Sequence, residues 1–275
     1  SSDLQRVSIP LGVIGIIYES RPNVTADAAA IAIKAGNAVI LRGGSESFHS
    51  SRAILDAIHQ GLHMAAIPLT AAQLVPTTDR EAVAHMLTMN DYIDVIIPRG
   101  GRSLTEHVKN QARVPVLLHL DGNCHTYLHA KADPQTARTV VLNAKLRRTG
   151  ICGATESLLL DQALPETIAK DVITALLDAG CELRGDAYTQ SLDARIHAAS
   201  EEDWATEYLA PILSVKRVGG LTDAIAHINH YGSHHTDAIL TEDKNAAQQF
   251  CREVDSAIVL VNASTQFADG GEFGF

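Results

Sequence analysis

Cys152 is the residue whose surroundings most favour chemistry. It lies in the turn TGICG (149–153), after a predicted helix that ends in Arg147 and Arg148 and before an apolar predicted strand. Glycines on both sides of the cysteine let the backbone bend and let a ligand approach closely. The two arginines favour a thiolate over a thiol. The sequence therefore predicts a nucleophilic Cys152, with a buried structural cysteine as the alternative.

Two glycine-rich turns have the residue types that bind phosphate. One reads RGGS (42–45) and the other reads RGG (99–101), and each follows an apolar predicted strand and opens a predicted helix. Backbone N–H groups at a helix N-terminus, beside an arginine, suit a phosphate. The GxGxxG fingerprint of dinucleotide-binding proteins is absent from the chain. Two ordinary strand–helix loops are therefore the alternative.

The histidines and cysteines do not form a metal-binding pattern. Thirteen histidines and four cysteines are present, and seven of the histidines, together with Cys124, cluster at 119–129 and 227–235. Neither cluster has the spacing of a zinc site, so we expect no metal. The cysteines are widely separated and form no CxxC pair, which fits reduced thiols in a cytoplasmic protein.

Composition narrows the function classes. The formal net charge of −10 disfavours nucleic acid as a partner. No apolar run reaches the roughly 18 residues of a membrane span, and no signal peptide is present. The chain starts at Ser1 and stops within GGEFGF (270–275), so both ends look truncated and we expect a segment of a longer protein.

Strand and helix signals alternate along the chain, which predicts an α/β fold with parallel sheets and helices on both faces. Strands are expected at 12–18, 37–41, 73–75, 94–97, 114–118, 156–160, 213–218, 238–241 and 256–261. Helices are expected at 25–35, 46–60, 79–89, 102–111, 133–147, 165–179, 222–231 and 243–254. A second α/β domain beginning near residue 119 divides the chain into domains 1–118 and 119–275.

Seven stretches in order resemble the γ-glutamyl phosphate reductase family, which belongs to the aldehyde dehydrogenase superfamily. They lie at 10–24, 34–47, 92–101, 121–128, 143–159, 234–241 and 261–275. The resemblance implies two Rossmann-like parallel-sheet domains, with the active site in the cleft between them. Domain 1–118 would bind NADP, and domain 119–275 would carry the nucleophilic cysteine. Residues 1–9 resemble the strand that relatives use in subunit pairing, so a homo-oligomer is implied.

The family's reaction gives the expected function. The resemblance implies reduction of L-glutamyl 5-phosphate to L-glutamate 5-semialdehyde with NADPH and release of phosphate, the second step of L-proline biosynthesis. A thioester on the catalytic cysteine would be the intermediate. A glutamate 5-kinase would supply the substrate and is an implied partner. The alternatives are a CoA-acylating aldehyde dehydrogenase and a catalytically inactive fragment.

Roles for single residues also follow from the resemblance. Cys152 matches the nucleophile, and Asn23, or Arg21 beside it, matches an oxyanion donor, with a helix cap as the alternative for Asn23. The cofactor-binding candidates are Arg42, Gly43, Gly44, Ser45, Arg99, Gly100, Gly101 and Glu207. Arg42 and Ser45 would favour NADP by binding its 2′-phosphate. A solvated carboxylate is the alternative for Glu207.

The substrate would be bound near the end of the chain. The resemblance assigns the glutamyl group to Arg21, His235, Thr236, Asn262, Ser264 and Thr265. Two positions depart from relatives: His119 replaces the Glu of aldehyde-oxidising enzymes, and Gln266 replaces a family Arg. Loss of the water-activating Glu agrees with a reductase, because hydrolysis would waste the thioester, although Asp121 lies close in sequence. Loss of the Arg puts the strength of substrate binding in doubt.

Overall fold

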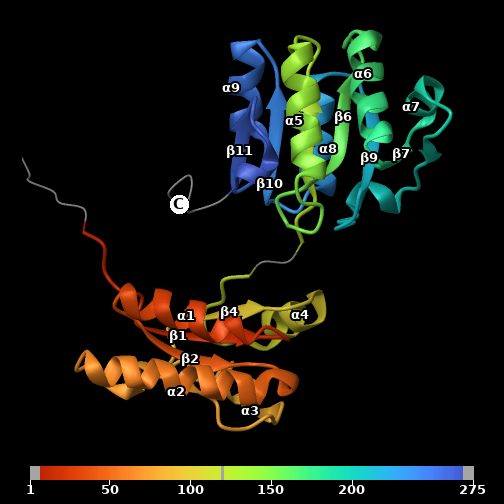
Figure 1. Cartoon of the computed structure of the whole chain (residues 1–275). Coiled ribbons are helices and arrows are strands. Elements are labelled where there is room, and N and C mark those ends of the chain that lie inside the picture. Colours follow the sequence, from red (N-terminus) through yellow and green to blue (C-terminus); the bar gives the residue numbers. More distant parts are fainter. Residues whose placement is uncertain (1–6, 119–120, 269–275) are drawn as a thin grey trace, which may run out of the picture. The chain divides into compact units, whose positions relative to one another are not determined.

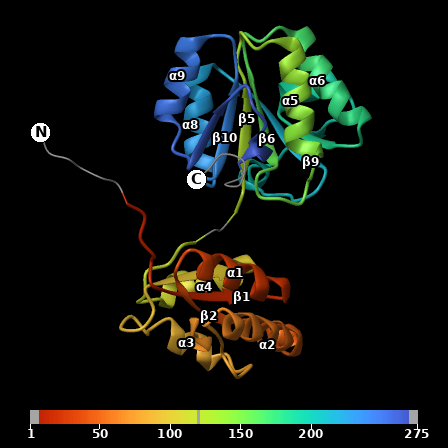
Figure 2. The ribbon, with the colours of Figure 1, turned by 60° about the vertical axis from the view of Figure 1, so that its left-hand side comes forward.

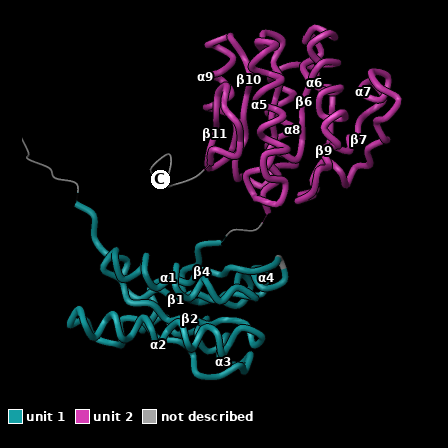
Figure 3. Tube along the Cα trace, viewed as in Figure 1, with its two compact units in different colours: residues 1–120 teal, residues 121–275 magenta. Residues whose placement is uncertain are grey.

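The structure consists of two compact units, each with its own parallel sheet and its own core. The computed structural model describes residues 7–118 and 121–268. The units comprise residues 1–120 and 121–275 (Figure 3), so the division lies two residues after the boundary expected from the sequence. Most of the strand expected at 1–9 lies outside the described residues, and residues 7–9 belong to no strand.

Unit 1 is built around the apolar strand β1 (Figure 1). Its sheet has the order β3-β2-β1-β4 with parallel pairings throughout. The strands are β1 (Val13–Tyr18), β2 (Ala38–Arg42), β3 (Ala72–Leu74) and β4 (Val95–Arg99). The helices are α1 (Asn23–Lys34), η1 (Ser45–Ser47), α2 (Phe48–Met64), η2 (Leu69–Ala71), α3 (Glu81–Met86) and α4 (Arg102–Gln111). The chain leaves β1 towards β2 and later returns to β4 on the other side, the reversal at which open α/β sheets bind ligands.

Unit 2 has a larger parallel sheet with the order β11-β10-β5-β6-β9-β7-β8. Its strands are β5 (Cys124–Leu128), β6 (Thr155–Asp161), β7 (Glu182–Gly185), β8 (His197–Ala198), β9 (Ile212–Val218), β10 (Thr236–Leu240) and β11 (Ile258–Val261). Its helices are α5 (Pro134–Leu146), α6 (Glu166–Asp178), α7 (Ala187–Leu192), η3 (Glu202–Ala205), α8 (Leu221–Tyr231), α9 (Lys244–Glu253) and η4 (Thr265–Phe267). Figure 2 shows β10, β5 and β6 side by side at the centre.

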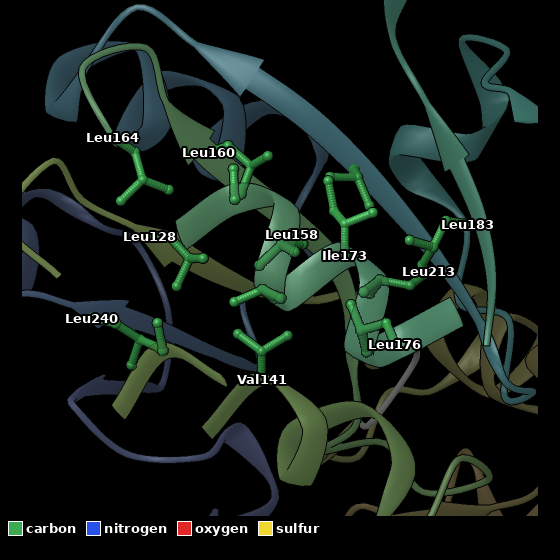
Figure 4. Packing of buried hydrophobic residues seen from close by; sticks show 14 of the residues in the cluster. Leu128, Val141, Leu158, Leu160, Leu164, Ile173, Leu176, Leu183, Leu213 and Leu240 are labelled. Carbon is green, nitrogen blue, oxygen red and sulfur yellow. The ribbon is translucent and has the colours of Figure 1, made fainter. Parts of the chain in front are cut away.

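The two faces of the unit 2 sheet bury alternate residues of the same strand. Leu158 and Leu160 of β6 pack with α5 and α6 (Figure 4). Leu159, between them, packs with α8 and α9 on the opposite face. A strand covered on both sides can bury apolar residues at consecutive rather than alternate positions, and this explains the three successive leucines, 158–160, in β6. The expected α/β class is confirmed.

Two expectations about strands were wrong. The strand expected at 114–118 is reduced to one isolated bridge between Ile96 and Val116, because Pro115 has no N–H to donate to a neighbouring strand. Strands β5, β7 and β8 were not expected, and the longest of them is β5. Its five residues are all buried, but His125 and Thr126 interrupt the apolar pattern by which buried strands are recognised.

Because each unit has a separate core, a cavity in one should act mainly on that unit. We expect Leu158→Ala to destabilise unit 2 by about 2–5 kcal/mol, since it removes buried methyl groups. The chain's single tryptophan, Trp204, is buried in unit 2 and reports its unfolding by fluorescence during urea titration. Leu69→Ala, at a position 45% exposed in unit 1, is the control. An unchanged fluorescence midpoint for Leu158→Ala would contradict the expectation.

Candidate active site

Cys152 lies in the loop between α5 and β6, at the edge of the unit 2 sheet where the parallel strands begin. Its side chain is half-buried. The backbone of this loop packs directly on Gly122, because a Cβ placed on Gly122 would lie 2.7 Å from the Cα of Cys152. Only glycine leaves room for this contact. The segment before β5 therefore fixes the position of the thiol-bearing residue.

Cys124, the first residue of β5, also contacts the Cys152 loop. Its Sγ donates to the carbonyl oxygen of Cys152 at 3.1 Å. Burial raises the pKa of the Cys124 thiol well above its usual value, so the group stays protonated and able to donate. The Nδ1 of His235 lies 3.7 Å from this Sγ and 2.8 Å from the hydroxyl of Thr236. His235 and Thr236, both expected to bind substrate, thus share the edge of the sheet with Cys152.

Glu207 is linked to the same segment. Its Oε1 accepts a hydrogen bond from the backbone N–H of Gly122 at 2.9 Å. Two residues further on, the N–H of Leu209 donates to Glu156 at 3.3 Å. Glu207 is half-buried and bonded beside the Cys152 loop, and its role in binding the cofactor stays a prediction.

A fully buried ion pair closes the base of the Cys152 loop. Lys145, near the end of α5, donates to Glu156, near the start of β6, and both side chains are 0% exposed. Burial raises the pKa of Glu156 to about 7, against the opposing effect of Lys145. The pair brackets the loop on both sides in sequence and also holds Leu209. It therefore joins the thiol loop to the segment that carries Glu207.

The segment around η4 covers the other side of the loop. The amide Nε2 of Gln266 donates to the carbonyls of Ala144 at 2.8 Å and Arg148 at 3.2 Å, which lack helical partners at the end of α5. A Cβ on Gly153 would lie 3.1 Å from the carbonyl oxygen of Thr265. Gln266 therefore braces the end of α5 and the start of the Cys152 loop.

Two other expected substrate ligands have different surroundings. Ser264 is buried, and its hydroxyl accepts from the N–H of Gln266 at 3.3 Å as the cap of η4. Thr265 is buried against the Cys152 loop, and its Oγ1 has no hydrogen-bond partner among the described residues. Thr265 is thus the nearer of the two to the cysteine loop.

Asn262 lies at the opposite edge of the sheet. Its side chain bonds the backbone N–H of Thr241 at 2.8 Å and the carbonyl of Thr241 at 3.0 Å, just after β10 ends. His235 lies just before β10 begins, and a five-residue strand separates the two ends by about 13 Å. The expectation that Asn262 joins the other substrate ligands does not agree with this position, because its amide joins the end of β11 to Thr241 after β10.

Unit 1 contains a pocket of about 730 Å³ at the carboxyl ends of its strands. Three of the expected cofactor ligands, Arg42, Gly44 and Ser45, line it. Residues that the sequence analysis did not identify also line it: Ile17, Tyr18, Glu19, Ser20, Glu46, Thr78, Arg80, Glu81, Val83, Ala84, Ser103, Leu104 and His107. The turn PTTDR (76–80) after β3 was the available signal, since it is a third strand–helix turn at the same edge.

Arg42 was expected to bind the 2′-phosphate of NADP, but its guanidinium is bonded to the protein backbone. Its side chain is 7% exposed and donates to the backbone carbonyls of Gly43, Thr78 at 2.9 Å and Asp79 at 3.3 Å. Its Nε is shielded from solvent and has no partner among the described residues. Arg42 therefore ties the turn after β2 to the turn after β3.

Carboxylates occupy backbone donors at this edge. Glu19 accepts from the N–H of Gly101 at 2.9 Å, and a Cβ on Gly100 would collide with the same carboxylate. Glu46 accepts from the N–H of Ser20 at 2.9 Å. Arg99 is exposed at the end of β4. This turn was expected to bind a phosphate of the cofactor. In the structure, the anion beside Gly100 and Gly101 is the carboxylate of Glu19.

Asn23 and Arg21 are exposed beyond the end of β1. The Nδ2 of Asn23 donates to Asp27 at 3.2 Å. Asn23 is the first residue of α1, and Pro22 precedes it without a side-chain cap. The capping alternative for Asn23 is therefore wrong, and the proposed oxyanion role stays a prediction.

Residues 7–118 and 121–268 contain neither a cluster of metal ligands nor a helix of membrane-spanning length. Within them, no three His, Cys, Asp or Glu side chains gather closely enough to hold a metal ion. No helix within these ranges is long and apolar enough to cross a bilayer. His119, the position at which oxidising relatives carry a Glu, lies outside the described residues, so its role stays a prediction.

Comparison with known proteins agrees with this arrangement. The sequence model of the aldehyde dehydrogenase family matches residues 3–190 and 197–274. Two curated γ-glutamyl phosphate reductases are similar over 271 residues, or 98% of the chain and 64% of each relative: that of Paramagnetospirillum magneticum at 60% identity and that of Rhodospirillum rubrum at 59%. The chain thus spans just under two thirds of the length of these relatives.

A solved structure shows the same fold. The crystal structure of γ-glutamyl phosphate reductase from Thermotoga maritima superposes with a TM-score of 0.93 at 42% sequence identity. The match covers 97% of this chain and 64% of that one. At this TM-score the two chains share the course of the backbone through both sheets.

Breaking the buried pair should be costly. We expect Lys145→Met to destabilise unit 2 by about 3–5 kcal/mol, because Glu156 is left buried without its counter-charge. The double variant Lys145→Met/Glu156→Gln removes both charges and should recover much of that loss. Urea unfolding followed by Trp204 fluorescence measures both. Lys170→Met breaks an exposed pair with Glu166 and should cost under about 1 kcal/mol. A double variant as unstable as Lys145→Met would contradict the expectation.

Acid should destabilise the protein partly through His227. The imidazole ring of His227 packs against the ring of Tyr231, with 4.6 Å between the ring centroids. Burial lowers the pKa of His227 from 6.5 to about 3. The unfolded chain then binds the proton first, so stability falls as the pH drops from 6.5 towards 3. The free energy of unfolding of His227→Gln, relative to that of wild type, should increase by roughly 3 kcal/mol as the pH falls from about 7.5 to about 4. Glu156 shifts in the opposite direction but is common to both proteins. A pH-independent difference in urea unfolding would contradict the assignment.

Proposed function

Since the chain belongs to the aldehyde dehydrogenase family, we propose that it carries out the NADPH-dependent reduction of L-glutamyl 5-phosphate to L-glutamate 5-semialdehyde with release of phosphate. The observation that carries the proposal is the Cys152 loop, which holds a half-buried thiol on a backbone fixed by Gly122 and Cys124. The similar proteins named γ-glutamyl phosphate reductase support the choice of substrate.

The unit 1 pocket fits the adenosine end of a nicotinamide cofactor. It lies at the carboxyl ends of parallel strands beside the chain reversal, where such cofactors bind in open α/β sheets. Gly43 packs on the ring of Tyr18, which lies 3.0 Å from a Cβ built on the glycine, so a side chain there would require the ring to shift. Ser45 and Arg80 line the opening. When bound, NADPH supplies the hydride that reduces the acyl group.

The thiol performs the first chemical step. The Cys152 thiolate attacks the acyl carbon of the substrate and forms a C–S bond, and the C–O bond to phosphate breaks with its electron pair leaving on phosphate. The product of this step is a thioester on Cys152. Arg147 and Arg148, both exposed near the loop, favour the thiolate that this step needs.

The remaining steps return the thiol to its starting state. Hydride addition to the thioester carbonyl gives a thiohemiacetal whose oxyanion needs a donor, for which Asn23 is the candidate. Collapse of the thiohemiacetal breaks the C–S bond, releases the aldehyde and restores the thiolate. His235 and Thr265, which lie by the Cys152 loop, are the candidates for binding the glutamyl group.

The proposed reaction also defines the setting. With this substrate it is the second step of L-proline biosynthesis, it takes place in the cytoplasm, and a glutamate 5-kinase supplies the acyl phosphate. We include assembly as a homo-oligomer in the proposal, on the resemblance of residues 1–9 to a pairing strand.

The reverse reaction provides the test. NADP⁺ reduction with glutamate 5-semialdehyde and inorganic phosphate should depend on Cys152, so Cys152→Ser should lower the rate by roughly a thousandfold or more while NADPH affinity is retained. Cys251→Ser, an exposed thiol on α9, is the matched control and should keep the wild-type rate.

Three outcomes would contradict the proposal. Undiminished turnover by Cys152→Ser would remove Cys152 from the mechanism. Turnover with coenzyme A in place of phosphate would indicate the CoA-acylating alternative. A wild-type chain that binds NADPH but turns over neither substrate would indicate a binding module.

A further inference from the structure

The unit 1 pocket contains two arginines with different surroundings. Arg42 is buried, and its guanidinium is engaged by the backbone carbonyls of Gly43, Thr78 and Asp79. Binding a phosphate would require it to leave those carbonyls, which would then lose their donors. Arg42 is therefore poorly placed to bind a phosphate.

Arg80 has the opposite character. It is exposed, lines the same pocket, and directly follows the two residues whose carbonyls Arg42 binds. Among the described residues, no carboxylate pairs with its guanidinium. An arginine with unused donors, on a turn fixed by a neighbouring buried arginine, is arranged to bind an anion bidentately.

The carboxylates in the pocket restrict where an anion can bind. Glu46 is fixed by the hydroxyl of Ser20 at 2.6 Å and lies 3.4 Å from the hydroxyl of Ser45. The bond from Ser20 lowers the pKa of Glu46, so it is charged at neutral pH. A phosphate placed on Ser45 would meet this like charge. The Thr78–Arg80 side offers a positive group instead, although Glu81 also lines it.

We propose that Arg80, rather than Arg42, recognises the 2′-phosphate of NADPH and sets the preference for NADPH over NADH. Arg42 acts as a positioning residue that holds the turn presenting Arg80. This inference rests on the proposed function, because it takes NADPH as the ligand of the pocket. It changes the assignment of the 2′-phosphate from the turn after β2 to the turn after β3.

Ligand binding tests the proposal without any turnover. Affinities of the 275-residue chain for NADPH and NADH, and for adenosine 2′,5′-bisphosphate and 5′-AMP, are measured by calorimetry. Arg80→Ala should weaken both 2′-phosphorylated ligands by roughly tenfold or more and leave NADH and 5′-AMP nearly unchanged. Arg80→Lys keeps the charge and should restore part of the affinity. Arg52→Ala, an exposed arginine on α2 outside the pocket, should change nothing.

Arg42→Met separates the two roles. Because Arg42 shapes the turn, its loss should weaken all four ligands in parallel. Selective loss of the 2′-phosphorylated ligands in Arg42→Met, or equal losses of all four in Arg80→Ala, would overturn the inference while leaving the proposed reaction intact. A wild-type chain that binds none of these nucleotides would instead refute the proposed function.

Discussion

The contact between the backbones of Gly122 and Cys152 is the constraint on which the candidate active site depends. Two segments 30 residues apart, one leading into β5 and one into β6, pack with no side chain between them. The thiol of Cys124 closes the contact with a hydrogen bond to Cys152. The N–H of Gly122 in turn holds Glu207. A larger residue at position 122 would displace the thiol loop and release the Glu207 segment together.

The candidate site residues lie at the carboxyl ends of the strands in unit 1 and at the amino ends of the strands in unit 2. In unit 1 the expected cofactor residues end or follow β2 and β4, at the carboxyl ends of the strands, where open α/β sheets bind ligands. In unit 2 the thiol loop precedes β6 and His235 precedes β10, so these candidate residues lie at the amino ends of the strands. The like ends of parallel strands lie on the same side of a sheet, and residues remote in sequence are therefore brought close together by the strand order alone. Asn262 lies apart from them because its amide is bonded to Thr241, just after the carboxyl end of β10.

Local residue patterns predicted the helices and strands whose boundaries are set by residues close in the sequence. The helix stops at Gly36 and Gly180 have φ of 81° and 84°, the left-handed region that glycine adopts without strain. Strand β5 escaped recognition because its polar residues are satisfied by other strands: His125 bonds Asp237 at 3.0 Å, and Thr126 bonds Thr155 at 2.9 Å. Such pairing over long sequence separations leaves no local signal. The same limit applies to Arg42, whose charge is visible in the sequence while its carbonyl partners are not.

Gln266 shows how a departure from a family pattern can be understood once its contacts are known. An arginine at this position could bind substrate charge, so its absence first suggests weaker substrate binding. Gln266 is buried, however, and its amide donates to Ala144 and Arg148 at the end of α5. A neutral amide satisfies these carbonyls without the cost of burying a charge. The side chain at position 266 thus holds the end of α5 to the start of the thiol loop, a role for which a neutral amide is sufficient.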